Sequence, residues 1–439
     1  MRTGGNCAQA ALFLLFALAG RHLWAQDAPR QNGRPVAVAP RFCEFHAFGR
    51  VAGSAGMMQF QAAAVPEAKG PAAGWGNSTP FRRAAESGAF LGKHGITFNG
   101  WLQLDGSNAA AGGQPDALGF DGQYLLDVAA MVNTKKFFGW PGGTFMVDTQ
   151  SHSGPSILTH QMPALQDPDN MDAYSETSVD RAWFHQDLLG RKLELQVGLM
   201  YVDDQYFTVP YGQNFISLDF SSDASISTFV LPTYPKGSFG GDVFAYPAKG
   251  LYVSAGMFND HSTELSYDPG GDLFLTEEGW QSRWHGLPYK LQVGAWRDTG
   301  RFRRFAGGLV HHAAGVYLVA SRKLWQPAPA SDRGLGMFFQ FGTGPPAVAA
   351  VRRHYGGGVV WTGPLAARPK DEIGLAFSDS LLTPQDGFTH GFENEIEGYY
   401  QVAVWRGLTV QPDVEYWQHP GGKSTPNTVL ALTRIMYTF

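Results

Sequence analysis

Hydrophobic and polar residues alternate with a period of two over much of the chain. In "ITFNGWLQLDG" (residues 96–106), Phe98 and Leu104 fall on one face of an extended strand, and Asn99 and Asp105 fall on the other. The alternation recurs in "KLELQVGLM", "LYVSAGMF", "LQVGAW", "EIGLAFS", "NEIEGYYQVAVW" and "LTVQPDVEYW". Because successive side chains of a strand point to opposite faces, this pattern predicts a sheet that lies between two different environments.

The C-terminal segment "TRIMYTF" (residues 433–439) is predicted to be a strand of the same kind. Ile435, Tyr437 and Phe439 make one face apolar, and Arg434 lies on the opposite face. Strands of membrane-spanning β-barrels have this pattern, with apolar residues toward lipid and polar residues toward the lumen. A β-sandwich is the alternative, because its outer face contacts water and its strands alternate as well.

Charges in mid-strand and aromatic residues at strand ends favour the barrel. Glu395 and Glu397 lie on the polar face of one predicted strand, where a water-filled lumen accommodates charge. Girdles of aromatic residues flank the apolar band of outer-membrane barrels. The aromatic residues predicted to form such girdles are Trp361, Trp405, Trp417, Tyr437 and Phe439.

The connections between the predicted strands are of two lengths. Arg406-Gly407 is a tight turn, whereas residues 150–178, 201–240 and 259–280 form long polar separators, an asymmetry typical of outer-membrane barrels. A tilted spanning strand needs about 9–11 residues plus its connection, so residues 96–439 leave room for about 16 strands. We therefore expect an all-β protein, a transmembrane antiparallel β-barrel of about 16 strands, wide enough for a water channel.

The N-terminal part of the chain predicts export. Residues 1–25 hold a short apolar core, "ALFLLFALAG", and are interpreted as a signal peptide for passage to the bacterial outer membrane. Residues 26–80 are rich in Ala, Gly, Pro and Gln and are predicted to be a flexible lead-in. Residues 81–95 are predicted to contain a short helix, before the barrel of residues 96–439.

Composition narrows the class of protein further. Charged residues make up 16% of the chain, below the soluble norm of about 25%. The net charge of −5 gives nucleic-acid binding no electrostatic support. Cys7 would leave with the signal peptide and Cys43 would then be alone, so neither a disulfide framework nor a cysteine metal cluster is expected. A secreted all-β binding protein that never inserts into a membrane also fits this composition.

Several segments, in order, resemble the OprB-type carbohydrate-selective porin family of bacterial outer membranes. The segments are "RAWFHQDLLGRKLELQVGLM", "VLPTYPKGSFGGDVFAYPAKGLYVSAGMFND", "RPKDEIGLAFSDSLL" and "ENEIEGYYQVAVWRGLTVQPDVEYWQHPGG", followed by a last strand that ends on Phe. The resemblance covers residues 76–439 in patches. It implies a water-filled barrel of 16 strands that admits sugars such as glucose down their gradient. We expect no cofactor, outer-membrane lipid and lipopolysaccharide as surroundings, and a monomer or a homotrimer.

Alternation also selects candidate pore-lining residues that would meet a sugar. Those predicted to point inward are Trp101, Lys192, Glu194, Glu395, Glu397, Asp413, Glu415 and Arg434. Arg181, in "DRAWFHQ", is added because the resembling family places charged residues near its pore narrowing there. Such side chains either match sugar hydroxyls with donors and acceptors, or only solvate the lumen and pair across strands. Trp101 either covers the apolar face of a sugar ring or fills space.

Other functions remain as alternatives. A general, non-selective diffusion porin has the same sequence pattern as a sugar porin. An enzyme is less favoured, because Ser153, His152 and His160 lie close in sequence without a spacing that assembles a catalytic triad. The adjacent His311 and His312 would point to opposite faces of a strand, so no metal site is expected there.

Overall fold

The structure is a computed structural model that describes residues 90–114, 119–260, 270–328 and 331–439. The predicted signal peptide and lead-in lie outside the described residues, as does most of the predicted helix of residues 81–95. Of that predicted range, residues 90–95 are described: residues 90–93 are helical, and residues 94–95 form a turn.

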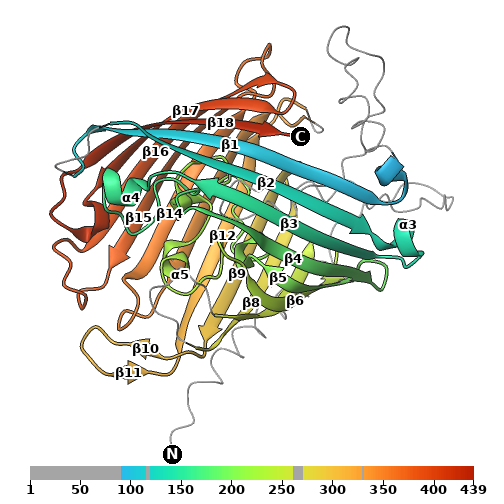
Figure 1. The fold of residues 1–439 in the computed structure, drawn as a ribbon, viewed down its shortest axis with the longest axis horizontal. Helices are drawn as coiled ribbons and strands as arrows, with labels where there is room; N and C mark the ends of the chain where they lie inside the picture. Colours follow the sequence, from blue (N-terminus) through green and yellow to red (C-terminus); the bar gives the residue numbers. More distant parts are fainter. Residues whose placement is uncertain (1–89, 115–118, 261–269, 329–330) are drawn as a thin grey trace, which may run out of the picture. The chain divides into compact units, whose positions relative to one another are not determined.

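Sixteen antiparallel strands of the described part close into a barrel (Figure 1). They are β1 (Ile96–Ala111), β2 (Asp121–Asn133), β3 (Gly143–Ser153), β4 (Glu176–Leu188), β5 (Leu193–Met200), β6 (Ser238–Ala248), β7 (Leu251–Asn259), β8 (Asp272–Trp284), β9 (Leu287–Asp298), β12 (Ala313–Trp325), β13 (Gly334–Thr343), β14 (Val351–Thr362), β15 (Glu372–Leu382), β16 (Phe392–Trp405), β17 (Leu408–Gln418) and β18 (Thr428–Thr438). Neighbours along the chain pair with each other, and β1 closes the ring on β18, with Asp105 opposite Arg434. The predicted fold class and strand number are confirmed.

The remaining elements are short and lie in the connections. They are α3 (Thr134–Phe138), α4 (Ile157–His160), η3 (Val202–Asp204), η4 (Leu218–Phe220), α5 (Ala224–Ser227), η5 (Pro420–Gly422) and the small hairpin of β10 (Phe302–Arg303) and β11 (Leu309–Val310). Tight turns such as Lys249-Gly250 and Arg406-Gly407 lie at one end of the barrel, and the long connections after β3 and β5 lie at the other. This is the asymmetry that the sequence predicts. The third predicted separator, residues 259–280, is wrong in its second half, because β8 begins at Asp272.

The alternation along the strands separates an apolar outer face from an inner face that carries buried polar side chains and, on β6 to β14, a buried apolar cluster. On β1, Phe98 and Leu104 are 57% and 41% exposed, whereas Gln103 and Asp105 are buried. On β18, Ile435 is exposed in the same way. The exposed apolar side chains suit contact with lipid. Among the described residues, none of the helices has the length and apolarity that crossing a membrane would require.

Most of the predicted girdle aromatics point outward at strand ends, but Trp417 does not. Trp361, Trp405, Tyr437 and Phe439 are exposed. The prediction for Trp417 is wrong, because this side chain is fully buried on the inner face. It follows Asp413 and Glu415 at two-residue intervals along β17, so alternation itself directs it into the barrel.

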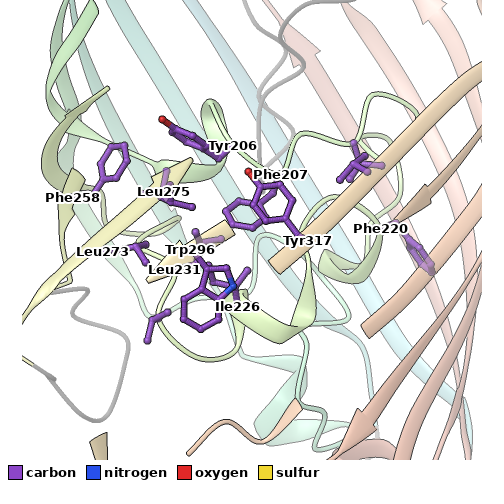
Figure 2. Close-up of a cluster of buried hydrophobic side chains, with 14 of the residues drawn as sticks. Tyr206, Phe207, Phe220, Ile226, Leu231, Phe258, Leu273, Leu275, Trp296 and Tyr317 are labelled. Carbon is purple, nitrogen blue, oxygen red and sulfur yellow. The ribbon is translucent and has the colours of Figure 1, made fainter. Parts of the chain in front are cut away.

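The connection between β5 and β6 (residues 201–237) packs against the inner wall of the barrel through apolar side chains. Figure 2 shows its Tyr206, Phe207 and Ile226 grouped with Trp296 of β9 and Tyr317 of β12. The rings of Phe207 and Tyr317 have centroids 3.9 Å apart. The wall formed by β6 to β14 is therefore covered, and the segment that covers it occupies part of the lumen.

Candidate functional site

Two connections fold inward and meet charged side chains of the wall. The first is residues 154–175, between β3 and β4, and the second is residues 201–237. Hydrogen bonds join the two ends of the first connection, because the Asp172 carboxylate accepts the Ile157 amide at 2.8 Å and the Ser156 hydroxyl at 3.0 Å. The second contacts a carboxylate of the barrel wall near its start, since Glu277 of β8 accepts a hydrogen bond from the Phe207 amide at 3.4 Å. We call them the first and second inward loops.

Glu277 also organises the aromatic side of the lumen. Its carboxylate accepts hydrogen bonds from the hydroxyls of Tyr252 at 2.5 Å and Tyr317 at 2.7 Å, and from the Gln292 amide at 3.2 Å. These bonds satisfy a carboxylate that is fully buried. A charge in this position is tolerated because several donors converge on it.

Arg181 holds the start of the second inward loop to three wall strands. Its guanidinium contacts the carboxylates of Asp148 on β3, Asp127 on β2 at 3.3 Å and Asp204 in η3 at 3.2 Å. The Arg181 Nε donates to Asp148 at 2.8 Å, and the ring of Tyr201 lies 4.8 Å from the guanidinium carbon. Burial raises the pKa of Asp204 to about 6 although Arg181 opposes the shift.

A β-bulge decides which way Arg181 points. The register between β3 and β4 shifts at Asp148/Thr149, so Asp180 is left without a partner on β3. Both Asp180 and Arg181 are buried, although they are adjacent. An extra residue in one strand reverses the alternation beyond it, so a strict period of two could not assign this residue to a face.

Arg434 plays the corresponding part for the first inward loop. Its Nη2 lies 2.6 Å from Asp105 of β1, 3.0 Å from Asp169 and 2.9 Å from the Asn170 side-chain oxygen. Gln103 donates to Asp105 at 2.9 Å and supports the pair from the same strand. The contact therefore spans the β1–β18 closure and a loop more than 250 residues away in sequence.

The glutamates of β16 bind the backbones of both loops. Glu397 accepts the amides of Ile216 at 2.6 Å and Ser217 at 3.2 Å, and Glu395 accepts the Ser217 hydroxyl at 2.7 Å. Glu393 accepts the amide of Leu165 at 3.1 Å. These bonds give buried loop amides the acceptors that water would otherwise supply.

The remaining predicted site residues have different surroundings. Asp413 and Glu415 of β17 are buried on the inner face, and Glu415 accepts the Trp417 indole N–H at 2.7 Å. Glu194 is buried and accepts the Tyr246 hydroxyl at 3.0 Å.

Trp101 and Lys192 differ from each other in exposure. Trp101 points inward from β1 and is 3% exposed. Lys192 lies in the exposed turn before Leu193, where β5 begins, so strand alternation does not apply to it.

Sequence reasoning did not find the carboxylates that pair with Arg181. Asp127 and Asp148 lie on the inner faces of β2 and β3, in strands for which no candidate was named, and alternation within "YLLDVAA" and "FMVDTQ" would have found them. Asp204 has no such signal, because it lies in a loop, and no repeating sequence pattern indicates that this loop turns inward. Half-buried Tyr211, Gln213 and Asn214 of the second inward loop were missed for the same reason.

The histidines and serine considered for catalysis or metal binding do not come together. Ser153 shares a hydrogen bond of 2.8 Å with Ser175, and His160 contacts Asp121 at 3.3 Å. Neither bond joins Ser153 to a histidine. His311 and His312 are exposed at the β11–β12 connection.

Comparison with known proteins agrees with the architecture. The family model of the carbohydrate-selective porins, OprB family, matches residues 120–439. Porin B of Pseudomonas aeruginosa is 22% identical over 402 residues, which cover 76% of this chain and 85% of that protein. The high-pH structure of Pseudomonas putida OprB is similar with a TM-score of 0.74 at 18% identity, over 81% of this chain and 97% of that one. The low-pH structure of the same protein gives 0.55 at 18% identity, over 81% and 96%.

Proposed function

The chain belongs to the OprB family of carbohydrate-selective porins of the bacterial outer membrane, and from this we propose that glucose-like monosaccharides cross its lumen by passive diffusion. The observation that carries the proposal is a closed barrel of sixteen strands with polar side chains inside and apolar side chains outside. Barrels of about this size leave an aqueous channel. The solute gradient is the only source of energy that the proposal needs.

We place the narrowing of the pore at the second inward loop. Gln213 and Asn214 are half-buried there, so part of each side chain stays accessible inside the barrel, whereas the hydroxyl of the neighbouring Tyr211 is buried. Asn214 is held in place, because its amide donates to Glu372 at 2.6 Å. Amide groups match sugar hydroxyls as donors and acceptors. Weak contacts of this kind let the solute leave again, as conduction requires.

The charged candidates act in this proposal mainly by holding the loops. Arg181 and Arg434 each contact several oxygen acceptors and are almost fully buried, so their donors are already engaged. The glutamates are engaged as well, because Glu395 and Glu397 accept hydrogen bonds from the second inward loop and Glu415 accepts one from Trp417. These side chains set the width and the charge of the narrowing rather than contacting the sugar directly.

A general diffusion porin is the second candidate function. The family and the fold are those of channels, and each barrel encloses its own lumen, so the proposal holds for a monomer and for a homotrimer alike. Selectivity for sugars is the part that needs a test.

Liposome swelling provides that test. Proteoliposomes of the purified protein are diluted into glucose, a disaccharide, or neutral amino acids of a size similar to glucose, and the initial swelling rates are compared. Sugar porin function predicts faster swelling in glucose than in the amino acids. An Asn214→Ala variant should reduce the difference, whereas Lys192→Ala, in an exposed turn, should leave it unchanged. Equal swelling rates for glucose and amino acids in the wild type would contradict sugar selectivity and would indicate a general diffusion porin.

A further inference from the structure

Four acidic side chains meet on the inner faces of β16 and β17. Glu397 lies directly opposite Glu415 in the strand register, and Glu395 precedes Glu397 by two residues on the same face. Each of these three glutamates offers a carboxylate oxygen, and the three atoms lie within 4.8 Å of one another. Asp413 precedes Glu415 by two residues on the same face of β17. All four side chains are at least 97% buried.

Within the part of the chain that the structure describes, this group has no cation at ion-pair distance, and Arg434 acts on Asp413 and Glu397 only from farther away. None of the four carboxylates forms an ion pair with a described Lys, Arg or His. The guanidinium of Arg434 on the adjacent strand is engaged by Asp105, Asp169 and Asn170. Like charges directly opposite each other on paired strands destabilise a sheet, and a buried charge needs a partner.

Some carboxylate oxygens of this group have no hydrogen-bond donor, which leaves room for a bound cation. Ser217, the backbone amides of the second inward loop and Trp417 occupy one oxygen of Glu395, both oxygens of Glu397 and one of Glu415. The buried Oε1 atoms of Glu395 and Glu415 and the Oδ1 atom of Asp413 have no hydrogen-bond donor. Buried carboxylate oxygens are rarely left without a donor or a cation.

We propose that Glu395, Glu397 and Glu415, supported by Asp413, bind a Ca²⁺ ion. All candidate ligands are oxygens, which Ca²⁺ takes in sets of about 6–8, whereas Zn²⁺ prefers nitrogen and sulfur. Ca²⁺ is favoured over Mg²⁺ because carboxylates fixed on two paired strands suit its flexible geometry better than a strict octahedron. Water or the Ser217 hydroxyl, which lies 2.7 Å from Glu395, would complete the set.

The ion would also tie the second inward loop to the barrel wall. Glu395 and Glu397 contact Ser217 and Ile216 of this loop, so fixing their carboxylates fixes the loop that we place at the narrowing. The site itself does not depend on which solute crosses the pore. Loss of sugar selectivity in the swelling assay would therefore leave the cation proposal standing, and the reverse holds as well.

Trp417 makes the site observable. Its indole N–H is 2.7 Å from Glu415, so Tb³⁺ bound in place of Ca²⁺ would receive excitation energy from this ring. The full-length protein is purified in detergent, stripped with a chelator and titrated with Tb³⁺ at neutral pH. We expect saturable Trp-sensitised emission, reversed by Ca²⁺ at lower concentration than by Mg²⁺, and one Ca²⁺ per chain by calorimetry.

Three variants locate the ion. Glu415→Gln should weaken Ca²⁺ binding at least tenfold. Glu372→Gln is the matched control, because this lumen-facing carboxylate already accepts bonds from Asn214, Tyr399 and Thr362 and should bind Ca²⁺ as the wild type does. Trp417→Phe changes no carboxylate and should lose the sensitised emission while Ca²⁺ still binds by calorimetry.

The competing explanation is that protons neutralise these carboxylates. The wild type would then show no saturable Ca²⁺ binding at neutral pH, and the proposal would be overturned. Binding that is equal in Glu415→Gln and in the wild type would also overturn it. Migration on an unboiled gel checks that each variant is folded, and if Glu415→Gln fails to fold, the Trp417→Phe emission decides the location.

Discussion

Arg181 is the residue whose replacement most directly tests how the second inward loop is held. Its guanidinium is the one described cation in contact with Asp127, Asp148 and Asp204, and it is fully buried. Replacement by methionine keeps most of the side-chain volume and removes the charge. Three carboxylates then remain in a buried site without their counter-charge.

The expected change in the free energy of unfolding follows from this loss of the counter-charge. Removing one partner of a buried ion pair costs about 3–5 kcal/mol, because the other partner stays buried and unpaired. Here one cation serves three acids, so we expect Arg181→Met to lower the free energy of unfolding by about 3–5 kcal/mol. Arg181→Lys should lose about half as much, since an ammonium group is a compact charge that cannot reach several carboxylates as the guanidinium fork does.

Equilibrium unfolding in urea, in lipid–detergent micelles and followed by Trp fluorescence, measures this difference. Single-channel recording of the same variant should show increased current noise, because Asp204 anchors the start of the loop. Arg191→Met is the matched control, since Arg191 is 59% exposed in its pair with Asp187 and should change stability by less than about 0.5 kcal/mol. A loss below about 1 kcal/mol for Arg181→Met would refute the reasoning, because it would mean that the acids do not rely on this arginine.

Two further predictions concern the aromatic wall and the response to pH. A Cβ on Gly294 would lie 2.1 Å from the Tyr317 ring, so Gly294→Ala should destabilise the barrel by about 1–3 kcal/mol in urea unfolding, whereas Gly391→Ala, with no atom within 4 Å, should be nearly neutral. Burial raises the pKa of Asp204 to about 6, above its unfolded value of about 4, so the stability that its proton contributes is present below pH 4 and is lost as the pH rises through 6. The difference in unfolding free energy between the wild type and Asp204→Asn should therefore fall from pH 4 to pH 7, and a constant difference would contradict the raised pKa.

The barrel could be predicted because its strands carry a local signal. Each strand faces lipid on one side and the lumen on the other, so the two environments impose a period of two that needs no knowledge of distant contacts. The faces of Asp105, Glu397, Glu415 and Arg434 follow from that period alone. Trp417 shows that the period is a better guide than residue type, since an aromatic residue at a strand end was assigned to the girdle against its own alternation.

The interior could not be predicted because its contacts are distant and its backbone is irregular. Asp169 meets Arg434 across more than 250 residues, and Ile216 meets Glu397 across about 180 residues. A loop that turns inward has no repeating pattern that distinguishes it from a loop in solvent. The bulge at Asp180 shows the limit within a strand, because one inserted residue reverses every assignment that follows it.

The distribution of charge inside the barrel is explained by the two loops that fold into its lumen. On the β6–β14 side, the second loop is attached by aromatic contacts such as Phe207 on Tyr317, which need no polar partner. On the β15–β18 side, the same loop presents backbone amides, and a buried amide needs an acceptor. Carboxylates meet that need best, since each has two oxygens and forms charge-assisted bonds, as Glu397 does with Ile216 and Ser217. Acids therefore gather on this wall beyond the number that Arg434 can balance, and the surplus negative charge is what the proposed cation would balance.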